Sequence, residues 1–419
     1  MYNPGLLNAS TSPFYHFSTG TIRDIDTSLN RLLITTQASK FRDACIFVDG
    51  TNILYDMKGQ PVWYLPLIDG RSVPTTDLKI SPQGTITFLS PEYAYEVNFN
   101  GDVLWRTPII NRANGQLAQH YHHEFTRLNN GNYMVLGTHP VSCRWLPDSS
   151  VKIIPDNNAV DSGILTIASG TIVEYDRAGN VVWTWESSKY FEKIDHKKNA
   201  SSLSRGCLDL HENSFFFDEK DKIIYLSFRN MNQVVKIKYP EGTIIGTIGE
   251  ETPKTTQNKK NNLFYGQHSV KRTSDGSIVL FNNNTQHGPF PTILKIKEPA
   301  LINDHAKITW EYKCTSNVAS KNGYVSGGNV VELPDNSMLV SMAIPANEIF
   351  IVNKDKHIVW SAATERYDDG QKKWLPLARY RASIIEGKQQ LERLIWGGEV
   401  NPGISQNSFA PIKSNRSQP

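Results

Sequence analysis

The chain has 419 residues and a formal net charge of +3, with charges of both signs mixed along its length. No block of Lys and Arg stands out, so the composition predicts neither a nucleic acid nor an anionic membrane as a partner. Nothing approaches the roughly 20 consecutive apolar residues of a membrane span, and the first residues do not begin a signal peptide. The sequence is therefore that of a cytoplasmic protein, or of one whose leader has been removed.

Taken in order, the chain reads almost throughout as short strands. Residues 1–30 show no strong periodicity and are predicted to form an N-terminal extension. From there to about residue 390, short alternating segments are separated by Gly, Asn, Asp and Pro turns, which is an all-β pattern. Residues 391–419 are predicted to be a peripheral tail. Polar insertions that interrupt the pattern are predicted to be loops, at 141–165, 187–204 and 250–262.

Two kinds of hairpin alternate along this pattern. The first kind, which we call the outer hairpin, has a polar turn, and its clearest copies close on a tryptophan. It occurs six times, at 52–63, 93–105, 171–183, 233–249, 293–310 and 348–360. The second kind, the inner hairpin, also occurs six times, at 76–89, 123–136, 211–226, 266–283, 328–340 and 379–387. Such four-stranded units at a period of roughly 40 to 60 residues are typical of a β-propeller.

We therefore predict an all-β fold, a six-bladed β-propeller of four-stranded blades over residues 31–390. The last inner strand, 378–385, has no hairpin after it, and the first outer hairpin has no inner strand before it. The ring is accordingly predicted to close by strand exchange between the N- and C-terminal segments. The tryptophans that end the outer hairpins are predicted to pack between blades.

Three inner strands open on a histidine, and these histidines carry the functional prediction. His123 and His268 each precede a turn glycine by eight positions, and His211 precedes a slightly longer turn. Equivalent positions of a cyclic repeat converge on a shared axis, so the three side chains should meet at the mouth of the central channel. The same alignment places Thr76, Gly328 and Arg379 at that level. Several imidazoles and an arginine suit an anion and general acid–base chemistry.

Other polar residues near these motifs have more than one interpretation. Neighbours on a strand face opposite ways, so only one of His122 and His123 should point into the channel, and the turn alignment favours His123. Arg229 leaves the strand paired with the one that bears His211, and a surface arginine on a blade loop is the alternative. The remaining histidines considered are predicted to be structural: His139, His287, His305 and His357.

The four cysteines do not form a recognisable site. Cys45, Cys143, Cys207 and Cys314 are far apart and include no CxxC pair. A zinc or thioredoxin-like site is therefore not predicted. Free thiols are favoured over a single disulfide.

The motifs around the histidines resemble those of the bacterial arylsulfate sulfotransferases, which move sulfate between phenols without the usual nucleotide donor. The resemblance covers roughly Thr76 to Ser383 and rests on the segments 122–132, 209–214, 227–230, 267–268 and 280–283. The separate N-terminal domain and secretion signal of the well-known periplasmic members are not evident. A periplasmic or secreted location is what the family implies. The oligomeric state stays open, with a homodimer as one option.

The resemblance also implies a reaction and the residues that perform it. His268 matches the nucleophile of a ping-pong transfer through a sulfohistidine. His211 and Arg229 match the residues that hold sulfuryl oxygens and stabilise charge at the leaving oxygen, and His123 matches a further histidine that exchanges the phenol proton. The partners are an aryl sulfate donor and a phenolic acceptor, with no cofactor and no metal. Adjacency to the motifs suggests Tyr121, Phe228 and Tyr265 as substrate contacts, and we add His122, beside His123, and Arg379, from the turn alignment.

Two other functions stay open beside the sulfotransferase. Three histidines converging on a channel could ligate zinc in a metal hydrolase, although they lack a ligand-spacing motif and Arg229 would repel a cation. A propeller can also serve as a non-catalytic binding platform. The residue types fit transfer, because a nitrogen nucleophile divides one displacement into two and cationic donors stabilise the leaving oxygen. The sequence leaves open whether Glu124 or Glu212 assists as a base.

Overall fold

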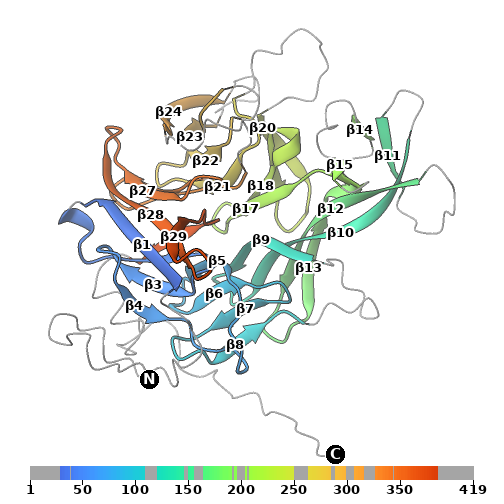
Figure 1. The fold of residues 1–419 in the computed structure, drawn as a ribbon. Helices are drawn as coiled ribbons and strands as arrows, with labels where there is room; N and C mark the ends of the chain where they lie inside the picture. Colours follow the sequence, from blue (N-terminus) through green and yellow to red (C-terminus); the bar gives the residue numbers. More distant parts are fainter. Residues whose placement is uncertain are drawn as a thin grey trace, which may run out of the picture.

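A computed structural model describes residues 29–37, 39–108, 120–145, 150–154, 164–190, 193–195, 203–204, 207–249, 263–284, 288–298, 306–315, 326–342 and 344–385. In this part of the chain, six blades, each built on a four-stranded antiparallel meander, stand in a ring (Figure 1). No α-helix occurs among these residues, only three short 3-10 turns, η5 (Ser39–Phe41), η7 (Ser187–Lys189) and η9 (Arg229–Met231). The predicted all-β, six-bladed propeller is confirmed.

Five blades follow the chain in order, each from its inner to its outer strand. Blade 2 contains β5 (Thr76–Ile80), β6 (Ile86–Leu89), β7 (Ala94–Val97) and β8 (Val103–Arg106). Blade 3 contains β9 (His120–Arg127), β10 (Tyr133–Trp145), β12 (Ile164–Tyr175) and β13 (Val181–Glu186). Blade 4 contains β17 (Glu212–Asp218), β18 (Ile223–Phe228), β19 (Gln233–Lys238) and β20 (Ile244–Gly249). Blade 5 contains β21 (His268–Arg272), β22 (Ile278–Asn282), β23 (Thr292–Lys297) and β24 (Lys307–Lys313). Blade 6 contains β25 (Asn329–Glu332), β26 (Met338–Ser341), β27 (Glu348–Val352) and β28 (Ile358–Asp368).

Blade 1 is assembled from both ends of the described chain. Its strands are β2 (Cys45–Val48), β3 (Ile53–Asp56), β4 (Pro61–Tyr64) and, as the inner strand, β30 (Ala382–Ile385). β30 pairs antiparallel with β2, with Cys45 opposite Ile385 and Val48 opposite Ala382. The predicted closure by strand exchange is confirmed.

Blade 6 carries two additional strands that the sequence did not predict. β1 (Asn30–Thr36) pairs antiparallel with β28 on its outer side, and β29 (Lys373–Pro376) pairs with the end of the same strand. In Figure 1, the blue β1 lies against the orange end of the ring. The N-terminal strand therefore covers the outer edge of blade 6, an edge that would otherwise present unpaired backbone groups.

Blade 3 extends beyond the ring (Figure 1). Long β10 and β12 pair as far as Arg144 opposite Ile164, and four short strands attach to them: β11 (Ser150–Ile154), β14 (Lys193–Asp195), β15 (Leu203–Ser204) and β16 (Cys207–Asp209). The prediction of loops at 141–165 and 187–204 is therefore wrong in part, because strands cover 141–145, 150–154 and 164–165 of the first insertion and 193–195 and 203–204 of the second. The insertion at 250–262 lies outside the described residues.

The tryptophans of the outer strands join neighbouring blades, as predicted. Five indole N–H groups donate to a backbone carbonyl in the next blade around the ring, and the Trp105 ring stacks on Tyr133 of the next blade with centroids 3.8 Å apart. The bonds are Trp63 to Phe99 (3.1 Å), Trp183 to Pro240 (2.7 Å), Trp185 to Gly242 (3.0 Å), Trp310 to Lys354 (2.9 Å) and Trp360 to Met57 (3.0 Å). Apolar clusters fill the spaces between the same blades. The blades are thus fixed to one another by packing and by directed hydrogen bonds.

Several sequence predictions concern parts that the structure describes only partly. The strands run from Asn30 to Ile385, and the predicted extension and tail fall outside the described residues except for Leu29 and Asn30. Cys45 and Cys314 are buried free thiols, and the side chains of the other two cysteines are not among those described. The described segments contain no helix with the length and apolar character needed to cross a membrane.

Candidate active site

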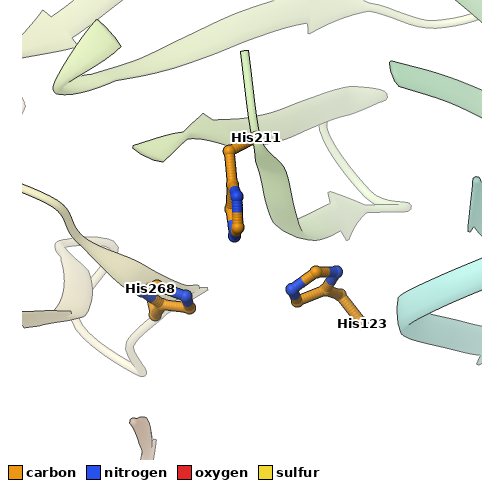
Figure 2. Close-up of side chains that lie close together, drawn as sticks. All are labelled: His123, His211 and His268. Carbon is orange, nitrogen blue, oxygen red and sulfur yellow. The ribbon is translucent and has the colours of Figure 1, made fainter. Parts of the chain in front are cut away.

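The three predicted histidines do converge. His123 from β9, His211 just before β17 and His268 from β21 point toward one another (Figure 2). Each offers a ring nitrogen that lies within 4.8 Å of the other two. The ring centroids are 5.6 Å apart for His123 and His211, 6.0 Å for His211 and His268, and 6.4 Å for His123 and His268. We call these residues the triad.

Irregular backbone at the start of each inner strand aims the triad. The pairing register shifts between Tyr121 and Phe125 in β9, between Glu212 and Ser214 in β17, and between His268 and Lys271 in β21. Left-handed φ angles accompany the shifts, +63° at His123, +58° at His211 and +58° at Ser269. Side chains other than glycine adopt this region rarely, and bulges of this kind re-aim side chains next to functional sites.

The same bulge changes the expected arrangement of His122 and His123. The two rings contact each other edge to face with centroids 4.6 Å apart, and their Nδ1 atoms are 2.5 Å apart. The prediction that they face opposite ways is therefore wrong, because the left-handed residue interrupts strand alternation. His123 is the member that joins the triad, as the turn alignment favoured, and His122 lies beside it.

His268 is the most buried member of the triad, with 1% of its surface exposed. Its Nδ1 lies 3.3 Å from the Gly266 carbonyl and 2.9 Å from the amide nitrogen of Asn283. That amide donates to the carbonyls of Gly266 (2.7 Å) and Gly327 (3.1 Å). The preceding Gln267 is fixed to blade 4 through donation to the Phe228 and Gln233 carbonyls. Neighbours on two sides therefore hold the imidazole in one orientation.

Two members of the triad are held in the neutral form. Burial lowers the pKa of His123 well below its ordinary value, and the nearby His122, His211, His268 and Arg381 lower that pKa further. Burial likewise lowers the pKa of His268, with His211, Arg229 and Arg381 adding to the effect. A buried imidazole among other potential cations loses its proton more easily. At neutral pH these rings carry free lone pairs.

Arg229 stands at the triad and not on an outer loop. Its backbone N–H donates to the His211 carbonyl (3.0 Å), which ties η9 to the start of β17. Its Nη1 donates to the Asn230 side chain (3.0 Å), while Nε and Nη2 are buried with no hydrogen-bond partner in the described part of the chain. Because Arg229 also lowers the pKa of His268, the guanidinium lies close enough to act on an anion bound there.

Two predicted substrate contacts are packing residues instead. Tyr121 belongs to an apolar cluster with Trp105 and Phe125, and its hydroxyl is hydrogen-bonded to that of Tyr175. Phe228 is fully buried in the cluster between blades 3 and 4. Adjacency to a motif was a poor guide here, because both side chains are packed in the apolar clusters between blades. Neither residue is retained as a substrate contact.

The positions aligned with the triad in the other blades do not add to it. Thr76 is exposed, and Gly328 has no room for a side chain, because an added Cβ would lie 2.4 Å from the Phe281 ring. Arg379 is turned away, donating to the Gly50 carbonyl (3.1 Å) and to the Asn30 side chain. Its prediction as a site residue is wrong. Tyr265 is half-buried with its N–H bonded to Asn282 (2.8 Å), and its role stays a prediction.

The closing segment contributes Tyr380 in place of Arg379. The Tyr380 ring meets the His123 ring edge to face, with centroids 5.7 Å apart. Its hydroxyl is buried, and burial raises the pKa of Tyr380 to about 12. Gly327, with a φ of +88°, also lies against this ring, and a Cβ added there would be 3.2 Å from it. The site is therefore bounded partly by the strand that closes the ring.

A buried ion network lies next to the triad, and sequence reasoning missed it. The Glu124 carboxylate accepts from Lys79 (2.9 Å), Lys271 (2.9 Å) and Arg381 (3.0 Å). Asp77 accepts from Arg381 (2.6 Å) and Lys79 (2.7 Å). The five residues come from blades 1, 2, 3 and 5. One hint of this network was visible in the sequence, because Glu124 is next to His123 and Lys271 is close to His268 in the chain.

This network answers one question that the sequence left open. Burial opposes the ionisation of Glu124, but Arg381, Lys271 and Lys79 outweigh burial and hold the pKa of this carboxyl well below its usual range. Its oxygens are occupied and it is only 1% exposed. Glu124 is therefore unsuited to act as a base. Glu212 turns toward blade 3, where it accepts the N–H of Gly170 (3.0 Å).

The triad fits an anion better than a metal ion. The three imidazoles each offer one nitrogen within 4.8 Å of the others, which by geometry alone could also hold a metal ion. Arg229 and Arg381, however, both act on His268 as positive charges. This positive potential opposes a cation at the triad, and the donor set suits the oxygens of an anionic group.

Comparison with solved structures finds chains of low similarity. A protein of unknown function from Bacteroides caccae is 12% identical, with 84% of this chain and 99% of that chain covered and a TM-score of 0.44. A streptogramin B lyase is 12% identical, with 80% and 87% covered and a TM-score of 0.36. The dihydro-haem d1 dehydrogenase NirN is 12% identical, with 85% and 77% covered and a TM-score of 0.38. These similarities carry no functional argument.

Comparison with protein families gives a different result. No curated protein matches the sequence. The model of the family "Arylsulfotransferase (ASST)" matches residues 31–295. This match covers more than half of the chain and includes the whole triad and Arg229. The chain therefore belongs to the arylsulfotransferase family.

Proposed function

We propose that this protein moves a sulfuryl group from an aryl sulfate ester to a phenolic acceptor in two steps, through a sulfohistidine at His268 and without a cofactor. One observation carries the proposal: the most buried of three converging imidazoles is held neutral beside an arginine whose Nε and Nη2 have no partner in the described chain. A neutral imidazole is the nucleophilic form, and unpaired guanidinium nitrogens are suited to sulfuryl oxygens.

In the first step, a ring nitrogen of His268 attacks the sulfur of the donor. The new N–S bond forms as the S–O bond to the aryl group breaks, and the electron pair leaves with the phenolate oxygen. Arg229 and His211 donate hydrogen bonds to the sulfuryl oxygens and to the leaving oxygen, where negative charge develops. The released phenolate takes its proton from solvent, because His123 is neutral at this stage. The product of this step is a sulfohistidine with the phenol released.

In the second step, the acceptor phenol takes the place of the leaving group. His123, neutral at neutral pH because burial lowers its pKa, removes the phenol proton as general base. The phenolate oxygen attacks the sulfur, the N–S bond breaks, and the electron pair returns to His268. His122, which contacts His123, and Tyr265, which precedes Gly266, remain candidate contacts for the phenol.

Transfer from 4-nitrophenyl sulfate to phenol tests the proposal. Wild type should release nitrophenolate only when acceptor is present, and His268→Asn should lose this release. His357→Asn, on the exposed turn between β27 and β28, serves as the matched control and should retain it. Mass spectrometry of wild type incubated with donor alone should show one added sulfuryl group on a peptide containing His268. Equal rates in wild type and His268→Asn would remove the sulfohistidine route.

A further inference from the structure

Arg381 is the least exposed cation near the triad. It is 4% exposed, and its Nη1 is shared between Asp77 (2.6 Å) and Glu124 (3.0 Å). Its Nε and Nη2 are buried and find no acceptor within the described residues. The guanidinium lies over the ring of Tyr380, 5.1 Å from the centroid, and the edge of that ring meets His123. One aromatic ring thus separates this cation from the triad.

We infer that Arg381 supplies, through space, part of the positive potential that binds the anionic sulfuryl group at the triad, and that Glu124 clamps it in place. The identity of the anion rests on the proposed function. Arg381 is a positioning residue in this role, because Tyr380 lies between it and the triad and it does not itself touch the substrate.

The charges around Arg381 leave an excess of positive potential. Arg381 faces Asp77 and Glu124 through ion pairs and Asp49 at longer range, while Lys79 and Lys271 complete the network and Arg229 stands at the triad. Four cations therefore face three acids. The third acid is only partly ionised at neutral pH, because burial raises the pKa of Asp49 to about 7. The excess lies beside His123 and His268, whose lowered pKa values keep both imidazoles neutral.

The contacts and the pKa shifts agree that this potential reaches the triad, because Arg381 lies over the ring of Tyr380 and the edge of that ring meets His123. Arg381 lowers the pKa of both His123 and His268, although the two rings belong to different blades. Burial also reduces screening by water. A unit charge several ångströms away can therefore change the equilibrium constant for binding an ion by about tenfold or more. An anion placed between the imidazoles would feel the same charge with the opposite sign.

A purely structural role for this ion pair makes a different prediction from an electrostatic one. Arg381→Gln removes a positive charge and Glu124→Gln removes a negative charge, while both break the same contact and keep a polar side chain. If the network only maintains the geometry of the site, both variants should weaken anion binding. If its charge matters, Arg381→Gln should weaken anion binding, whereas Glu124→Gln should leave it unchanged or make it tighter.

The experiment is calorimetric binding of inorganic sulfate to the full chain at fixed ionic strength, with thermal unfolding to verify that each variant is folded. Arg381→Gln should weaken sulfate binding by about tenfold, and Glu124→Gln should leave it unchanged or tighter. Arg106→Gln is the matched control, because it removes an arginine with 47% side-chain exposure from the outer strand of blade 2 and should leave the affinity unchanged.

Three results would overturn the inference: similar weakening by both network variants, no change in Arg381→Gln, or no sulfate binding by wild type. Should Arg381→Gln not fold, Glu124→Gln decides alone, since weaker binding contradicts the inference and equal or tighter binding supports it. Sulfate binding does not depend on the transfer reaction, so the two proposals can be told apart. If the variants bind sulfate as expected but the protein transfers no sulfuryl group from aryl sulfates, the inference on Arg381 is supported and the proposed function is contradicted.

Discussion

The edge of the Tyr380 ring faces the imidazole of His123, with ring centroids 5.7 Å apart and the planes at 72°. This contact joins the segment before β30 to β9 of blade 3. The strand that closes the propeller therefore also supports one member of the triad. A substitution of Tyr380 should alter the orientation of the His123 side chain without changing the fold of blade 3.

Replacing Tyr380 separates the role of its ring from that of its hydroxyl. Burial raises the pKa of Tyr380 to about 12, so the hydroxyl stays protonated at assay pH. We expect Tyr380→Phe to keep kcat/KM for an aryl sulfate within about twofold, and Tyr380→Ala to lower it by about tenfold, because the edge contact to His123 is lost. Steady-state kinetics of the two variants measures both effects. An Ala variant as active as the Phe variant would contradict the supporting role.

The pH dependence of the first step should reflect the depressed pKa of His268. An imidazole with the ordinary pKa of 6.5 would lose nucleophilicity as the pH falls below that value, whereas burial keeps the pKa of His268 well below it. We therefore expect kcat/KM for the donor to stay level from about pH 8 down to about pH 6. The profile of kcat/KM against pH is the measurement. A limb with a midpoint near 6.5 would show that His268 titrates normally.

The stability of the protein should fall in acid for the same reason. The folded-state pKa of His123 lies below the unfolded value, so the unfolded chain binds the proton first as the pH decreases. The stability is fully present above about pH 6.5 and is lost as the pH falls toward the depressed folded value. Urea unfolding at pH 7.5 and pH 5.5 measures this loss. His123→Asn should show a smaller loss than wild type, with His357→Asn as the exposed control.

Asn283 should be required for the orientation of His268. Its amide donates to two buried carbonyls and contacts the imidazole Nδ1 at 2.9 Å. Asn283→Ala leaves both carbonyls without this donor and should lower the free energy of unfolding by about 1 to 3 kcal/mol, with a fall in kcat as the ring loses its support. Denaturant unfolding and kinetics test this. Asn100→Ala, on an exposed turn of blade 2, should change neither.

Chelation should not affect transfer. The triad lies beside Arg229 and within the field of Arg381, so the proposed chemistry uses cationic side chains where a hydrolase would use a metal ion. Dialysis against a chelator should leave the rate of nitrophenolate release within about 20% of that of untreated protein. Removal of a catalytic metal would instead lower the rate by about tenfold or more, which corresponds to a loss of about 1.4 kcal/mol or more of transition-state stabilisation. Loss of activity that zinc restores would instead support the metal hydrolase.

The sequence predicted those features that short-range patterns encode. Turn glycines fix the register of an inner hairpin, so the positions of His123 and His268 relative to Gly131 and Gly276 were enough to place both at the ring axis. The unpaired inner strand near the end of the pattern was enough to predict closure on β2. The first inference depends on turn chemistry that recurs along the chain, and the second depends on matching inner strands to outer hairpins.

Features that depend on backbone detail or on distant partners could not be predicted. β30 has no turn of its own to set its register, which is why Arg379 was chosen and Tyr380 was missed. The left-handed φ of His123 is invisible in a strand pattern, so the expected alternation with His122 failed. The Glu124 ion pairs join residues 147 and 257 positions apart, and nothing in one sequence links them.

The exchange of β30 into blade 1 has a consequence for the order in which the protein is made. Asp77 and Arg381 are 304 positions apart, so the ribosome must add nearly the whole ring before the ion network can form. Until then, β2 has no inner neighbour, and its exposed backbone groups can pair with another nascent chain. Long-range pairing of this kind is also slow to form. We therefore expect the proposed activity to appear only after Arg381 has been synthesised and the ring has closed.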